Sequence, residues 1–180
     1  MNGFAAVLVL LGVFWTQASA LDSYVLKDPN KGYVTGTMTI DNGRNIVDVH
    51  IRSGAQSSDS IFDYSRGYIA TRLFSRHACF ILEINKKDIP ELQEIGRTAF
   101  EKKVLREVYN RRNVWVQFQS AHSWFGDFKD WLRYGRPIER LCSGLPLYRL
   151  ERAEPLRDPH GCAAAGIPGV LRLNICEKAK

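Results

Sequence analysis

Apolar runs rich in aromatic and β-branched residues alternate with short polar turns between residues 61 and 85, in the stretch IFDYSRGYIATRLFSRHACFILEIN. This pattern predicts a short strand at 61–64 and two adjacent strands at 68–74 and 78–85, separated by the turns Ser65-Arg66-Gly67 and Ser75-Arg76-His77. The last strand is apolar on both faces, with Phe80, Leu82 and Ile84 on one and Cys79 and Ile81 on the other. Such a strand needs cover on both faces, so we expect layers above and below this sheet.

A second alternating block, residues 33–52, surrounds the sequence Asp41-Asn42-Gly43-Arg44. An Asn-Gly pair at the tip favours a hairpin with a tight type I′ turn. Gly36 lies inside the first strand of this hairpin and indicates a bulge. The following segment, SGAQSSDS at 53–60, has the composition of a flexible polar linker.

Helical spacing follows in two places. Over 88–108, Asp88 can cap a helix, Pro90 suits its first turn, and Gly96 should weaken its middle. Over 123–135 an aromatic stripe recurs at helical spacing and is typical of core; it consists of Trp124, Phe125, Phe128, Trp131 and Leu132. Short strands are expected at 114–118, 145–150 and 170–176, a helical turn from Pro137, and an exposed loop at 151–161. The fold class is therefore α+β.

The first twenty residues have the pattern of a signal peptide. Residues 5–15 form an apolar run too short to span a bilayer, and Ala18-Ser19-Ala20 has the small-x-small form of a cleavage site. We expect cleavage after Ala20 and a secreted, extracellular protein, with an uncleaved anchor as the alternative. No later stretch is apolar enough to cross a membrane. The predicted mature chain begins with a hairpin region at 21–53 and ends with a cysteine-bounded segment at 151–180.

The chain has four cysteines, and in an oxidising compartment an even number predicts two disulfides with three possible connectivities. Cys162 and Cys176 flank CAAAGIPGVLRLNIC, which could close as a local loop and leave Cys79 for Cys142. A zinc site is the alternative, built from His77, Cys79, His160 and Cys162. The C-x₂-C spacing of zinc ligands is absent, so we expect neither a metal nor a cofactor.

The formal net charge is +6, but the basic residues are scattered and are not interleaved with base-stacking aromatics, which argues against nucleic acid. A solvated basic surface is the simplest interpretation, and mucin or an acidic glycan is a possible partner. Four histidines lie in unlike contexts, away from any Gly-x-Ser-x-Gly or His-Glu-x-x-His pattern. We therefore expect no catalytic residues and no enzyme activity.

Several short motifs together resemble the BRICHOS domain pattern of one aspartate and two cysteines. They are Phe62-Asp63-Tyr64, Cys79-Phe80-Ile81-Leu82, Ile89-Pro90, Leu141-Cys142 and Leu145-Pro146-Leu147-Tyr148. The longer stretches 61–84 and 137–148, with the C-terminal cysteine-bounded segment, are similar to the gastrokines. The similarity is closest to the gastrokine 2 branch or a gastrokine 3-like paralogue, and it covers almost the whole mature chain.

The resemblance implies a domain over 54–150 with a central β-sheet between two helices and Cys79 bonded to Cys142. It also implies a non-catalytic protein of the gastric mucosa, with chaperone-like, anti-amyloid peptide binding and a role in mucosal maintenance and restraint of epithelial proliferation. The alternative is a basic factor associated with mucus or glycans that acts as the ligand of an epithelial receptor.

Asp63 is the family-characteristic acid, and we expect either that its ionisation sets helix packing or that it accepts hydrogen bonds in a turn. β-Prone peptides should bind at an exposed sheet edge, in a groove beside the 88–108 helix, or on a strand face with Tyr68, Arg72, Phe80 and Leu82. In gastrokine 2 a cysteine just before the Phe-Asp-Tyr motif bonds a trefoil factor. Gln56 or Ala55 stands there in this chain, so a covalent trefoil heterodimer is not expected.

Overall fold

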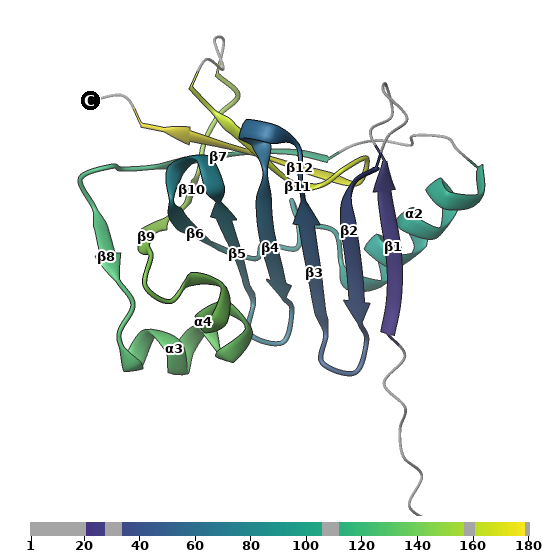
Figure 1. The fold of residues 1–180 in the computed structure, drawn as a ribbon, viewed down its shortest axis with the longest axis horizontal. Helices are drawn as coiled ribbons and strands as arrows, with labels where there is room; N and C mark the ends of the chain where they lie inside the picture. Colours follow the sequence, from purple (N-terminus) through teal and green to yellow (C-terminus); the bar gives the residue numbers. More distant parts are fainter. Residues whose placement is uncertain (1–20, 28–33, 106–111, 157–160, 179–180) are drawn as a thin grey trace, which may run out of the picture.

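The computed structural model describes residues 21–27, 34–105, 112–156 and 161–178 (Figure 1). Its larger sheet has eight strands, all antiparallel to their neighbours except β6 and β9, which are parallel. In spatial order they are β1 (Leu21–Lys27), β2 (Val34–Asp41), β3 (Ile46–Ile51), β4 (Ser58–Asp63), β5 (Tyr68–Leu73), β6 (Ala78–Glu83), β9 (Pro146–Arg149) and β8 (Ser123–Phe125). Two 3₁₀ turns, η1 (Gly54–Gln56) and η2 (Phe74–Arg76), connect strands of this sheet.

A second, four-stranded sheet lies across one end of the first, and its strands run across those of the larger sheet in Figure 1. Its order is β10 (Glu151–Arg152), β7 (Arg112–Phe118), β12 (Leu171–Glu177) and β11 (Ala163–Ile167). β12 is parallel to β7, and the other two pairs are antiparallel. The described helices are α2 (Leu92–Leu105), α3 (Phe128–Tyr134) and α4 (Arg136–Cys142).

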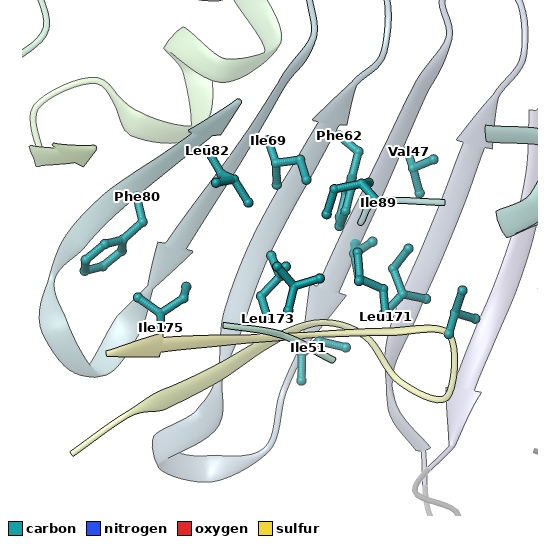
Figure 2. Packing of buried hydrophobic residues seen from close by; sticks show 14 of the residues in the cluster. Val47, Ile51, Phe62, Ile69, Phe80, Leu82, Ile89, Leu171, Leu173 and Ile175 are labelled. Atoms are coloured by element: carbon teal, nitrogen blue, oxygen red, sulfur yellow. The ribbon is translucent and has the colours of Figure 1, made fainter. Parts of the chain in front are cut away.

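The main core lies between the two sheets. Figure 2 shows Phe62, Ile69 and Phe80 of the larger sheet pointing toward Leu173 and Ile175 on β12. Helix α2 adds Ile95 and Ala99 to the same core. Burying each large apolar side chain stabilises the fold by about 1.5–3 kcal/mol, so this interface holds the second sheet and α2 onto the first.

Helices α3 and α4 cover part of the opposite face. There Tyr134, Ile138 and Cys142 pack on a second set of buried residues, which includes Ala70, Cys79, Ile81 and Leu147. The predicted alternation along β6 is therefore confirmed, because Phe80 and Leu82 lie in one core and Cys79 and Ile81 in the other. The predicted α+β class is confirmed as well. The cover on one face, however, is largely a second sheet, which the sequence did not predict.

The hairpin at 34–51 forms, but its predicted tight turn is wrong. Asp41 pairs with Ile46, so the connection is a four-residue loop, and Asn45 takes the left-handed conformation with φ of 55°. The Asp41 carboxylate accepts hydrogen bonds from the backbone and side chain of Arg44 and holds this longer turn. The predicted linker is also wrong at its end, since β4 already begins at Ser58.

Two helical predictions change, and a third is confirmed. Helix α2 begins at Leu92, and Asp88 lies 3.4 Å from Arg152 as an ion pair and does not cap the helix. The expected continuation to 108 lies outside the described residues. The predicted 123–135 helix is divided into strand β8 and helix α3, whose cap is Asp127. The short helix from Pro137 is confirmed as α4.

Candidate functional site

Asp63 ends β4 as a buried carboxylate with only 2% of its surface exposed. Its Oδ1 accepts the Ser65 hydroxyl at 2.5 Å and the Arg66 backbone N–H at 3.0 Å. The turn after β4 is thereby closed around the acid, which is the arrangement of a carboxylate hydrogen-bonded in a turn.

Arg66 also extends this turn to helix α3. Its Nε lies 3.9 Å from Asp63 Oδ2, and its Nη1 donates to the carbonyl oxygen of Leu132 at 3.0 Å. A cation at the C-terminal end of a helix is favoured by the exposed carbonyls there. Asp63 thus lies at the sheet–helix junction, and the idea that its ionisation sets helix packing stays a prediction.

The neighbouring Tyr64 connects the same turn to the other face of the sheet. Its hydroxyl donates to the carbonyl oxygen of Pro90 at 2.7 Å, just before helix α2. Burial, followed by the nearby charges of Glu94 and Glu91, raises the pKa of this phenol, so Tyr64 remains a hydrogen-bond donor at neutral pH.

The strand face suggested as a peptide site does not exist as one surface. Phe80 and Leu82 are core side chains beneath the second sheet. Tyr68 and Arg72 lie on the opposite face, where both are half-buried. The Tyr68 hydroxyl accepts a 2.7 Å hydrogen bond from Arg133, and Arg72 stacks 4.9 Å from the Phe74 ring centre. We therefore correct the suggested face, because β-strand alternation places its two pairs on opposite sides.

The suggested groove beside the helix is likewise filled. Ile95 of α2 is fully buried in the core, and a Cβ added to Gly96 would lie 3.7 Å from the Ile40 side chain. The helix therefore packs directly on the larger sheet at these positions, without space for a peptide.

Strand β1 was not singled out by sequence reasoning and forms one edge of the larger sheet. All seven of its residues pair with β2, and among the described residues no strand is placed on its other side. Within β1, the Leu26 side chain is buried in the main core, whereas the side chains of Leu21 and Val25 are 56% and 62% exposed. The apolar residues Tyr24 and Leu26, two positions apart, were the signal that could have predicted this strand. The polar residues Asp22 and Ser23 just before them made the pattern too short to recognise. An edge strand presents unpaired backbone donors and acceptors to which another strand can add.

A polar cluster on β3 and β4 lies on the face of the larger sheet that points away from the second sheet. Asp59 Oδ1 lies 2.8 Å from His50 Nδ1 and 2.6 Å from Arg52 Nη1, and His50 Nε2 is 3.4 Å from Asp48. Burial acts to raise the pKa of Asp59, but the hydrogen bonds and charges of Arg52 and His50 outweigh it and lower that pKa. For Asp48, burial dominates and raises the pKa. The cluster is a charge network without a nucleophile.

The four cysteines form two disulfides, Cys79–Cys142 and Cys162–Cys176. The first joins β6 to α4 inside the second core and is the pairing that the resemblance implies. Cys79 and Cys162 are therefore unavailable as zinc thiolates, and His160 lies outside the described residues. Gln56 is an exposed residue of the η1 turn. Because every cysteine of the chain is paired, a covalent partner would have to open an internal disulfide.

The BRICHOS domain family model matches residues 54–149 of this chain. Gastrokine-2 of Rattus norvegicus is 38% identical, over 98% of this chain and 97% of its own, and Gastrokine-2 of Mus musculus is 36% identical over the same shares. Gastrokine-1 of Homo sapiens is 29% identical over 81% of this chain and 78% of its own. No solved structure gives a significant match. The chain therefore belongs to the gastrokine family of BRICHOS-domain proteins.

Membership of this family, together with the two disulfides, supports a secreted protein of the stomach. In the part of the chain that the structure describes, no helix has the length and apolar character needed to cross a bilayer.

Proposed function

We propose that this gastrokine is a secreted, non-catalytic, chaperone-like protein of the gastric mucosa that binds β-prone peptide segments and opposes their assembly into fibrils. The same family resemblance supports, as part of this proposal, a role in mucosal maintenance and restraint of epithelial proliferation. The observation that carries peptide binding is strand β1, a seven-residue edge of the larger sheet with two exposed apolar side chains.

An extended peptide adds to such an edge through backbone hydrogen bonds, which do not depend on its sequence. Side chains of the added strand then lie beside those of β1. Leu21 and Val25 share one face of the sheet because they are four residues apart on a strand, and they offer an apolar surface to alternate residues of the peptide. The edge thus favours apolar, β-prone segments, which are those that form fibrils.

Fibril growth of an amyloid-forming peptide, followed by thioflavin T fluorescence, tests this proposal. Wild-type protein should slow growth at substoichiometric amounts, and Val25→Lys should lose most of this effect, because a lysine on an edge strand opposes strand addition. Val25→Thr is the matched control, since it keeps a β-branched side chain at an exposed position.

Melting temperatures of the two variants must stay close to wild type, as the exposure of Val25 predicts. Equal retardation by Val25→Lys and Val25→Thr would remove β1 as the binding edge. Unchanged fibril growth with wild-type protein would contradict the chaperone-like function itself.

An acidic glycan is the second candidate ligand, favoured by a cavity of about 360 Å³ beside β7 and β8. Its lining combines Trp124 and His122 with the cations Arg133, Arg149 and Lys178, and it also contains the acids Asp130 and Glu151. An aromatic face with cations around it suits a sugar ring that carries a carboxylate. Saturation-transfer NMR should detect sialyllactose but not lactose, and Arg149→Gln/Lys178→Gln should remove the signal. Equal signals from both sugars would contradict this candidate.

A further inference from the structure

The corner formed by helices α3 and α4 exposes large apolar side chains. Phe128 is 75% exposed and Leu132 is 62% exposed, and they lie four residues apart on one face of α3. Phe125, at the end of β8, is exposed as well. This corner lies at the opposite end of the larger sheet from β1 (Figure 1). The sequence predicts these residues as core, so their exposure on a folded helix calls for a different role.

The helix that carries them is held at both ends. Asp127 and Asp130 form a capping box at its start, and Arg66 bonds the Leu132 carbonyl oxygen at its end. Trp131 turns inward over Gly126, where a Cβ would lie 2.2 Å from the indole ring. The exposed side chains are therefore presented by a fixed helix, which lowers the entropy cost of binding.

A cavity of about 580 Å³ lies beside this apolar surface. Phe128 and Leu132 line one part of it, and Arg136 and Arg140, one turn apart on α4, line another. Neither of these two guanidinium groups has a carboxylate at ion-pair distance among the described residues. Glu139 is the one acid in the lining. The cavity therefore combines an apolar wall with two cations that have no ion-pair partner in the described part of the chain.

We infer that this cavity binds an acidic segment of a partner protein, with an aromatic or branched side chain on Phe128 and Leu132 and carboxylates on Arg136 and Arg140. Guanidinium groups pair with carboxylates in a planar, often two-pronged geometry, which gives such a site its specificity. An anionic lipid surface fits less well, because a flat membrane over this corner would also face Asp127 and Asp130, which lie outside the cavity lining and would repel it.

A fluorescein-labelled peptide that alternates Glu with Leu and Phe is the probe, and its anisotropy reports binding. Arg136→Gln/Arg140→Gln and Phe128→Ser/Leu132→Ser should each weaken binding by on the order of tenfold or more. Lys86→Gln/Arg97→Gln is the matched control. It removes two exposed positive charges far from the cavity and should leave the affinity within about twofold of wild type.

Peptides with Lys in place of Glu, or Ser in place of Leu and Phe, should not bind. Equal loss of affinity in the Lys86→Gln/Arg97→Gln control, or equal binding of the Lys peptide, would overturn the inference. Binding to phosphatidylserine vesicles without binding to the peptide would overturn it in favour of a membrane. Val25→Lys should keep full affinity for the probe, which separates this site from the edge at β1.

Discussion

At the residue scale, the consecutive residues Phe62, Asp63 and Tyr64 connect the larger sheet to what covers it. Phe62 is buried against the second sheet, Asp63 reaches α3 through Arg66, and Tyr64 reaches the carbonyl of Pro90 before α2. Alternation along a strand requires this division, because successive side chains leave on opposite faces. The motif is thus a structural junction between the larger sheet and the elements that cover its two faces.

Asp63→Asn tests the strength of that junction. The amide loses the ion pair with Arg66 and weakens two hydrogen bonds to a buried carboxylate, so the free energy of unfolding should fall by about 2 kcal/mol at pH 7. Ser65→Ala removes one of these donors and should cost about half as much. Urea denaturation measures both, and an Asn variant as stable as wild type would refute the assignment.

Asp59 gives the chain a defined response to acid. Its pKa is lowered in the folded state by Arg52 and His50, so its stabilising contribution is present above the pKa of the unfolded chain, about 4. That contribution is lost as the pH falls through the lower folded pKa. Arg72 and Asp48 complete the charged surroundings on the neighbouring strands.

We therefore expect Asp59→Asn to melt at a lower temperature than wild type at pH 7, with the difference shrinking as the pH is lowered below about 4. Circular dichroism melting curves measure this difference. They should cover roughly pH 2.5 to 7.5, which brackets the titration of a carboxyl group. A difference that stays constant over the whole range would show that Asp59 does not act through its charge.

At the element scale, the strands around residues 61–85 could be predicted because a high content of aromatic and β-branched residues and the turn residues between them agree there. Strand β11 could not, since Ala163, Ala164, Ala165 and Gly166 have weak strand preference and acquire it by pairing with β12. The start of β4 was hidden for a similar reason: Ser58 and Ser60 read as linker, yet both are buried, and Ser60 pairs with Thr71 across the sheet at 3.0 Å.

The candidate sites were harder to predict from the sequence than the strands, because whether a side chain is exposed depends on the tertiary structure. Phe128 and Leu132 have the same sequence pattern whether a helix is buried or exposed, so periodicity alone predicted core. Phe80 and Leu82 were correctly placed on one face, but the second sheet that covers them is assembled from residues beyond 111. The local sequence pattern predicts which side chains share one face of a strand or helix. Packing with residues far away in the sequence decides whether that face is exposed to solvent.

Gly36 and Gly96 should respond in opposite ways to substitution by alanine, because Gly36 lies in a tightly packed strand and Gly96 in a helix with room for a Cβ. A Cβ at Gly36 would lie 2.0 Å from the His50 carbonyl oxygen, so Gly36→Ala must push β2 away from β3 and should lower the melting temperature. A Cβ at Gly96 meets only the Ile40 side chain at 3.7 Å, so Gly96→Ala should stabilise helix α2 by about 0.5–1 kcal/mol. Differential scanning calorimetry measures both, and changes of the same sign would contradict this difference.

At the scale of the whole molecule, the two disulfides hold different layers. Cys79–Cys142 ties the larger sheet to α4, whereas Cys162–Cys176 closes a hairpin of the second sheet. Their sequence separations are 63 and 14 residues. In the chain-entropy model these closures contribute about 4 and about 3 kcal/mol to stability.

Cys79→Ala/Cys142→Ala should therefore destabilise the protein more than Cys162→Ala/Cys176→Ala, since it opens the longer loop and leaves a cavity in the second core. Urea denaturation of both double variants under the same conditions gives the comparison. The reverse order would mean that the second sheet, and not the junction of β6 with α4, limits global stability.

Peptide binding as proposed above requires that a β-prone peptide adds to the larger sheet at the β1 edge. Amide hydrogen exchange with and without an amyloid-forming peptide tests it most directly, since backbone pairing protects the outward amides of the edge strand. Peptide addition at β1 should slow exchange within Leu21–Lys27 and leave exchange in β8 and β11, which are other edge strands, unchanged. Protection at β8 or β11 with none at β1 would contradict it.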